Sequence, residues 1–148
     1  MLAAEGLGAL ERRLGHSFRD RALLLRALTH ASYAHEHSPE PDNASLALLG
    51  DAVLALVVTE RLWDTTGDEP VGVLTTRRAE VVAGAMLARW AERIELGPLL
   101  RLGRGEQLTG GRQKDSLLAT ALEAVLGAVY LEGGLDVARA VVGRLWVW

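Results

Sequence analysis

The sequence predicts an all-α protein that forms a single helical domain over residues 1–148. Apolar residues recur at helical spacing in several long segments, and glycines and prolines separate these segments. No segment shows the convincing alternation of apolar and polar residues that is typical of a half-buried strand. With 49% hydrophobic and 24% charged residues, the chain has the composition of an ordinary globular domain.

The composition excludes several kinds of protein and site. The chain contains no cysteine, so disulfides and thiolate metal sites are excluded. The first residues lack the pattern of a signal peptide, and the longest apolar run falls short of the ~20 residues that span a bilayer. We therefore expect a cytoplasmic protein without membrane contact.

The basic residues are unusual in kind, because all of the 16 except Lys114 are arginines. Arginine suits bidentate phosphate contacts, but a genome rich in arginine codons produces the same bias. The net charge of −3 argues weakly against a general nucleic-acid binder.

The expected helices follow from the apolar spacing and from capping residues. Gly15 should end the first helix, Asp20 and Asn43 should cap the second and third, and Gly97-Pro98 should end the fourth. Asp115 or Ser116 should cap the fifth, and glycines should separate it from the sixth. The glycine-rich segment 102–112 lacks the spacing of a phosphate-binding loop and is interpreted as a connector. The expected helices cover residues 9–14, 21–28, 43–63, 74–94, 117–131 and 135–148, and residues 34–42 form an exposed loop.

The central segment 43–58 is apolar on almost every side, which predicts a buried helix. Asp51 lies in its middle, directly after Gly50. A buried carboxylate needs a cation, a metal or hydrogen-bond donors. Asp51 is thus either a structural aspartate paired with an arginine or a functional carboxylate.

Glu123 is the corresponding lone carboxylate of a second apolar segment, residues 119–128. If both helices are buried, Asp51 and Glu123 should face each other, and a shared cation would relieve their repulsion. The alternative is that Thr120 and Glu123 form a capping box at a helix start. Leu117 and Leu118 begin the apolar pattern upstream, which favours the first interpretation.

The histidines do not indicate a catalytic or zinc site. No two of them share i, i+4 spacing, which makes a helical zinc site improbable. His30 is interpreted as a core histidine bonded to backbone, and His35 and His37 as solvated loop residues.

Several motifs together resemble the catalytic domain of the ribonuclease III family. They are the opening LERRLGHSF (10–18) and LLRALTHAS (24–32), the signature-like NASLALLGDAVL (43–54), the loop LGRGEQLTGGRQKDSLLA (102–119) and the closing ALEAVLGAVYLEGG (121–134). The resemblance covers nearly the whole chain from about Leu7 onward and implies the endonuclease-domain fold of that family. It also implies magnesium-dependent cleavage of double-stranded RNA, rather than of a small molecule, by a homodimer.

The departures from the family pattern fall at the site that the resemblance implies. The signature, usually written NERLEFLGDAVL, has two glutamates where this chain has Ala44 and Ala47, and the aspartate of the later Asp-x-x-Glu pair is Thr120. Of the four carboxylates thought to bind metal, Asp51 and Glu123 remain as candidate catalytic and metal-binding residues. Ser45 and Leu48 replace an arginine and an interface phenylalanine, a spread that is more typical of natural divergence than of deliberate inactivation.

The expected consequence is a poor or inactive nuclease. Two of the four metal ligands are lost. If each loss lowers metal affinity or activity about 10–100-fold, the total loss is roughly 3–5 kcal/mol. We expect a domain that engages double-stranded RNA with weak Mg²⁺ binding and weakened or absent cleavage, and no double-stranded-RNA-binding domain in this chain. The alternative is a non-catalytic structural or interaction module of the same fold, associated with ribosomes or with a partner subunit.

Overall fold

The computed structural model describes residues 4–146, and the regular structure in this range is helical, as predicted. The elements are α1 (Ala4–Leu14), α2 (Arg21–Ala27), α3 (Ala31–Glu36), α4 (Ala44–Thr66), α5 (Val71–Val81), α6 (Gly84–Arg93), η1 (Gly97–Leu99), α7 (Arg104–Leu108), η2 (Gly111–Gln113) and α8 (Asp115–Leu145). Within these residues, the one β-type pairing is an isolated bridge between Thr29 and Arg101.

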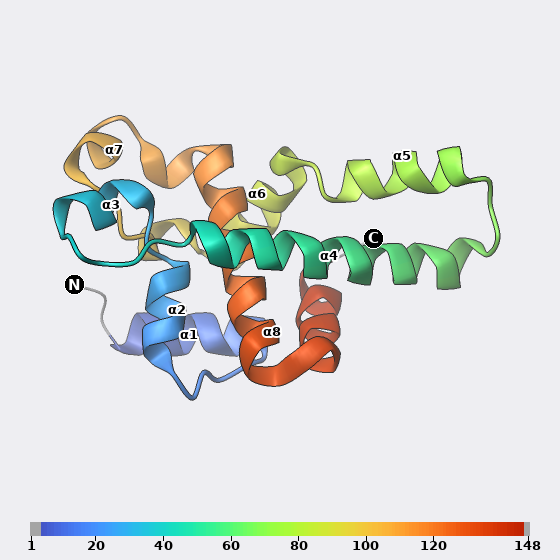
Figure 1. The fold of residues 1–148 in the computed structure, drawn as a ribbon, viewed down its shortest axis with the longest axis horizontal. Coiled ribbons are helices and arrows are strands. Elements are labelled where there is room, and N and C mark those ends of the chain that lie inside the picture. Colours follow the sequence, from blue (N-terminus) through green and yellow to red (C-terminus); the bar gives the residue numbers. More distant parts are fainter. Residues whose placement is uncertain (1–3, 147–148) are drawn as a thin grey trace.

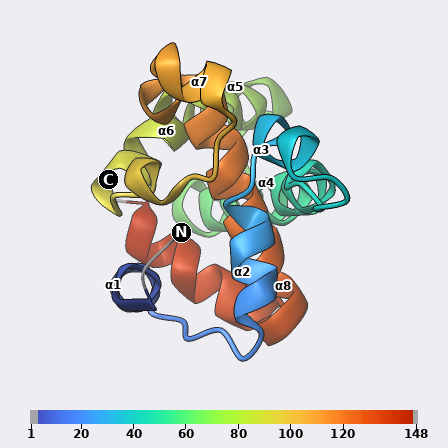
Figure 2. The same ribbon diagram turned by 90° about the vertical axis from the view of Figure 1, so that its left-hand side faces the viewer.

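The two longest helices, α4 and α8, cross steeply in the middle of the molecule (Figure 1). Helices α1 and α2 lie beside α8 at one end, and α6 packs against α8, with Arg93 donating to the carbonyl of Leu145 at its end (Figures 1 and 2). Side chains from all of these helices form one hydrophobic core. The C-terminal end of α4, after Leu62, extends beyond this core, and α4 and α5 form a helical hairpin (Figure 1).

The crossing of α4 and α8 depends on two glycines. A Cβ atom on Gly50 would lie 1.6 Å from the carbonyl oxygen of Glu123. A Cβ atom on Gly127 would lie 2.3 Å from the carbonyl oxygen of Leu46. The two backbones therefore touch directly, at a separation that only glycine permits.

Several predicted helix ends are confirmed. The Asp20 side chain accepts a hydrogen bond of 3.0 Å from the amide of Ala22 and caps α2. Gly15 follows α1 with a φ of 76°, as a glycine that ends a helix does. The start of α1 was predicted too late, because its first turn has a weak apolar pattern.

Asn43 does not cap α4, contrary to the prediction. Its side-chain amide donates to the carbonyl of Ala27, and its backbone amide donates to the carbonyl of Thr29. Asp42 accepts the hydrogen bond from the amide of Ala44 instead. The buried Asn43 thus ties the start of α4 to the end of α2.

Other predicted boundaries were wrong where local sequence did not show the break. The predicted helix 74–94 is two helices, because the chain turns at Val82 and Ala83 between α5 and α6. The predicted loops 34–42 and 102–112 contain part of α3 and the short helices α7 and η2. The helix predicted from 43 to 63 continues to Thr66.

The last two predicted helices form one element, α8, with a sharp kink. Gly134 has a non-helical φ of 78° inside it, so the predicted break is present as a turn in direction. Lys114 precedes α8, and neither Asp115 nor Ser116 caps it. Residues 147 and 148, the end of the predicted final helix, lie outside the described residues.

Among the described residues, α8 is the one helix that is long and apolar enough to cross a membrane. Its most apolar window has a mean hydropathy of 1.4, and 56% of that window is buried inside the domain. Burial of this kind is typical of the core helix of a globular fold.

Glu132, just before the kink, anchors the loop between α1 and α2. Its carboxylate accepts hydrogen bonds from the amides of Asp20 (2.8 Å) and Arg19 (3.0 Å) and lies 3.1 Å from Nε2 of His16. The Arg19 guanidinium donates to the Glu132 carbonyl. These bonds hold the N-terminal helices against the C-terminal half of the core.

The glycine contact can be tested by adding one methyl group. Gly50→Ala should lower the free energy of unfolding by about 3 kcal/mol or more, because the methyl group would overlap the Glu123 carbonyl. Gly72→Ala in α5 is the matched control. Nothing lies within 4 Å of its Cβ position, so it should stabilise by about 0.5–1 kcal/mol. Urea unfolding measures both, and equal stability of the two variants would contradict the contact.

Candidate functional site

The structure brings Asp51 and Glu123 together, as the sequence predicts. Asp51 follows Gly50 in α4, and Glu123 belongs to the turn of α8 whose carbonyl contacts Gly50. When Glu123 is protonated, its carboxyl group can donate a hydrogen bond to Asp51. The direct contact of the helix backbones is what allows these two short side chains to meet.

The surroundings of Asp51 differ from the prediction. Asp51 is exposed and Glu123 is half-buried, so the pair lies at the edge of the core, open to solvent. Helix α4 is not buried all round, because one side of it carries exposed apolar residues. Among the ion pairs of residues 4–146, none joins Asp51 to an arginine, which rules out the structural pairing considered above.

The carboxyl group of Glu123 keeps its proton to a higher pH than an ordinary glutamate does. Burial of its carboxyl group, followed by the hydrogen bond with Asp51 and by repulsion from that carboxylate, raises the pKa of Glu123 from 4.5 to about 7. A proton between the two carboxyl groups therefore compensates part of their charge.

The residues around the pair come from the same faces of the two helices. Ala44 and Ala47 precede Asp51 by seven and four positions, which places them along the same side of α4. Thr120 precedes Glu123 by three positions in α8, and its hydroxyl donates to the carbonyl of Ser116. Because α8 begins at Asp115, Thr120 lies in its second turn, and the capping-box alternative is wrong.

The pair offers a limited metal site. Across residues 4–146, no group of three or more His, Cys, Asp or Glu side chains is arranged to hold a metal ion. Mg²⁺ needs six oxygen ligands and often takes only one or two from protein carboxylates, with water and substrate phosphates supplying the others. Asp51 and Glu123 fit one hydrated Mg²⁺ in that manner.

The other candidate residues have structural roles. His30 caps α3, since its Nδ1 accepts a hydrogen bond of 3.1 Å from the amide of Ser32, and it is half-buried rather than in the core. His37 stacks on Tyr33 with ring centroids 3.9 Å apart, so it is not simply solvated. Sequence reasoning missed Gly127, although its spacing of four from Glu123 in an otherwise apolar helix was a usable signal.

Comparison with known proteins places this geometry in a class. The family model described as ribonuclease-III-like matches residues 20–147 of the chain. An all-helical domain with a carboxylate pair at the crossing of its two longest helices is thus a nuclease domain of the ribonuclease III type.

Individual proteins that are similar to this chain support the same class. The chain is 50% identical over 134 residues to ribonuclease 3 of Caldanaerobacter subterraneus and 54% identical over 137 residues to that of Streptomyces coelicolor. These alignments cover 90% and 93% of the chain but only 59% and 49% of the relatives. A solved ribonuclease III nuclease domain from Campylobacter jejuni, described for flexibility in a region involved in dimer formation, superposes with a TM-score of 0.89. Its sequence is 37% identical, and the alignment covers 94% of each chain.

The chain therefore belongs to the ribonuclease III family. It spans between about half and three fifths of the length of these two relatives.

The raised pKa of Glu123 has a measurable consequence for stability. The carboxyl group binds its proton more tightly in the folded state, so its stabilising contribution is complete below pH 4.5 and is lost as the pH rises to about 7. Because the group is partly solvated, we expect a loss of about 1 kcal/mol, or about 2–4 °C in Tm.

The control is Glu123→Gln, whose amide resembles the protonated acid at every pH. The difference in Tm between this variant and the unchanged chain should grow in favour of the variant from pH 5 to pH 8. Thermal unfolding across this range tests the pair, and a difference that is independent of pH would contradict a shared proton.

Proposed function

We propose that this chain engages double-stranded RNA as a ribonuclease III-type domain whose cleavage is weakened or lost. The observation that carries the proposal is the carboxylate pair, in which Asp51 and Glu123 stand alone beside Ala44, Ala47 and Thr120. The resemblance to the family signature places carboxylates at all three of these positions in the active enzymes.

The charge at the site supports reduced catalysis. Two-metal cleavage of a phosphodiester needs ions held about 3.5–4 Å apart by several carboxylates. Because the pKa of Glu123 is raised to about 7, a proton neutralises part of the negative charge of the pair near neutral pH, which weakens its attraction for metal. Asp51 and Glu123 would hold one ion, whose chemical contribution is to neutralise RNA phosphate charge.

RNA binding itself should depend on arginine contacts with phosphate. The affinity for a short RNA duplex should fall at least about tenfold between about 50 and 200 mM salt, as expected when two or more phosphates are neutralised. Fluorescence anisotropy with a labelled duplex measures this slope. An absence of binding at low salt would instead favour the alternative of an interaction module without RNA.

Restoring carboxylates should rebuild a magnesium site. Ala47→Glu with Thr120→Asp should make cleavage of long double-stranded RNA detectable, and Ala44→Glu should raise the rate further. Without Mg²⁺ these variants should be less stable than the unchanged chain, because the added carboxylates repel Asp51 and Glu123. With Mg²⁺ the loss should be recovered by RT ln(1 + [Mg²⁺]/Kd).

Matched controls keep the shape of the restored side chains without their charge. Ala47→Gln with Thr120→Asn should give neither cleavage nor a magnesium-dependent rise in Tm. Strong magnesium-dependent cleavage by the unchanged chain would contradict the proposal, since two carboxylates would then suffice.

We further propose that the chain acts as a homodimer through the exposed apolar side of α4. Leu48, Leu56 and Trp63 lie on one side of this helix and are 75%, 48% and 53% exposed. Val71 of α5 and Leu131 of α8 add further exposed apolar surface. This many large exposed apolar side chains, which we call the apolar stripe of α4, are unusual on the surface of a monomer.

Substitutions in this stripe test the dimer. Leu56→Glu should convert the protein to a monomer, because a carboxylate would be buried without a partner. Leu48→Phe should tighten self-association by about tenfold through added aromatic contact in both subunits. Sedimentation velocity at micromolar concentrations measures both effects.

Leu108→Glu is the control, since Leu108 of α7 is 86% exposed but lies away from the stripe. This variant should sediment like the unchanged chain. If the unchanged chain sediments as a monomer at every concentration, the proposed dimer is contradicted.

A further inference from the structure

A pocket lies apart from the carboxylate pair, between the N-terminal helices and the segment that follows α6. Its volume is about 550 Å³. No lining residue belongs to α4 or α8. Cavities of 300–1,000 Å³ with mixed lining are typical of small-molecule sites.

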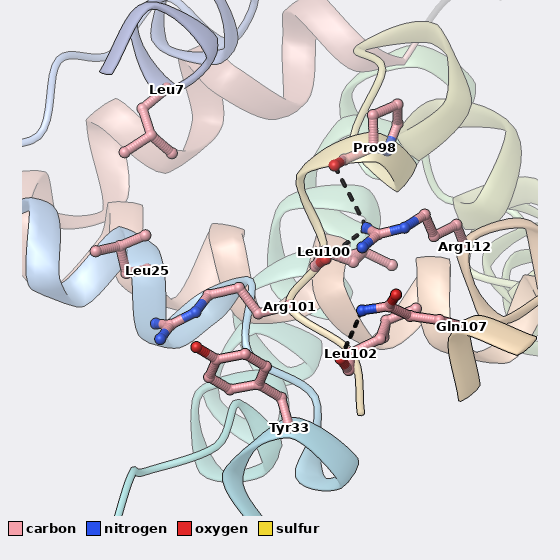
Figure 3. A pocket seen from close by; sticks show the side chains of 9 residues that line it. All are labelled: Leu7, Leu25, Tyr33, Pro98, Leu100, Arg101, Leu102, Gln107 and Arg112. Atoms are coloured by element: carbon pink, nitrogen blue, oxygen red, sulfur yellow. Dashed lines mark hydrogen bonds between the residues drawn. The ribbon is translucent and has the colours of Figure 1, made fainter. Parts of the chain in front are cut away.

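The lining combines apolar walls with hydrogen-bond donors (Figure 3). Leu7 and Leu25 form one wall, and Leu100 lies between the polar groups. The polar side chains are the guanidinium groups of Arg101 and Arg112, the Gln107 amide and the Tyr33 hydroxyl. No carboxylate is among the residues that line this pocket.

Arg101 and Tyr33 are held rigidly. The Arg101 guanidinium lies over the Tyr33 ring, 4.3 Å from its centroid, and is paired with Glu40 at 3.1 Å. His37 stacks on the same tyrosine. The charge of Arg101 is therefore compensated, and Tyr33 offers the pocket its hydroxyl rather than an open face.

Arg112 is the other positively charged residue of the lining, and its charge has no carboxylate partner within the pocket. Its Nη1 atom donates to the carbonyls of Gly97, Pro98 and Leu100, which fixes the guanidinium at the pocket wall. These acceptors are neutral, and none of the ion pairs among residues 4–146 involves Arg112. The carboxylates of Glu92 and Glu95 line a smaller cavity, of about 250 Å³, that Arg112 also borders.

We infer that this pocket binds a small organic anion, with its phosphate or carboxylate on Arg112 and its apolar body against Leu7, Leu25 and Leu100. A guanidinium fixed by neutral carbonyls keeps donors in the planar fork that suits both kinds of anion. The apolar walls reduce the screening of this charge by water. The inference does not depend on RNA binding or on the carboxylate pair.

The experiment is an NMR titration of the ¹⁵N-labelled chain with three probes. Adenosine 5′-monophosphate tests an organic phosphate, indole-3-acetate tests an organic carboxylate, and inorganic phosphate tests an anion without an apolar body. At least one organic probe should shift the amides of Leu100, Arg101 and Leu102 and saturate below about 1 mM, while those of Asp51 and Glu123 stay unchanged. Inorganic phosphate should bind at least about tenfold more weakly, because it gains no apolar contact.

Two variants assign the binding to this pocket. Arg112→Gln should weaken it at least about tenfold, because the charge is lost, whereas Arg104→Gln removes an exposed arginine outside the lining and should have no effect. If Arg112→Gln does not fold, Leu25→Trp serves instead, since it fills the cavity and leaves the bonds of Arg112 in place. No saturation by either organic probe, or equal binding by Leu25→Trp, would overturn the inference.

Discussion

The direct contact between the backbones of α4 and α8 is the constraint on which the rest of the structure depends. At Gly50 and Gly127 each helix occupies the space that a side chain of the other would need. The two helices cross steeply at this contact, and their side chains form one core together with those of α1, α2 and α6. Because the contact leaves no room for even a methyl group, the positions next to it are fixed with little freedom.

The same contact explains why two carboxylates meet at the surface of an apolar core. Asp51 is the neighbour of one contact glycine, and the carbonyl that touches this glycine is that of Glu123. Their side chains converge because the backbones behind them do. Burial and the neighbouring Asp51 carboxylate raise the pKa of Glu123 to about 7, so uptake of a proton below that pH relieves the repulsion between the two groups. A bound cation would displace that proton, so metal affinity and pH are coupled at this site.

The exposed apolar side of α4 and the carboxylate pair lie close together, whereas the pocket at Arg112 is separate from both. Exposed leucines and Trp63 lie along one side of α4, beside the carboxylate pair, so any second copy bound there would also border the site. The pocket at Arg112 is built instead from short elements at the N-terminal end and from the segment around Leu100. None of its lining residues belongs to α4 or α8, which makes the two sites separable by mutation.

The sequence by itself determined the helical class, the family and the two candidate carboxylates, because these follow from local periodicity and from motifs that lie within single segments. Asp20 as a cap and Gly15 and Gly134 as break points are likewise local properties of the chain. The sequence did not show that Asn43 bonds to α2 instead of capping α4, or that the predicted helix 74–94 turns between α5 and α6. The sequence also indicated that Glu123 is the partner of Asp51, but only the tertiary structure decided that Asp51 is exposed rather than buried. Exposure and pairing depend on how closely the helices approach, and that distance is set by Gly50 and Gly127 together, two residues far apart in the chain.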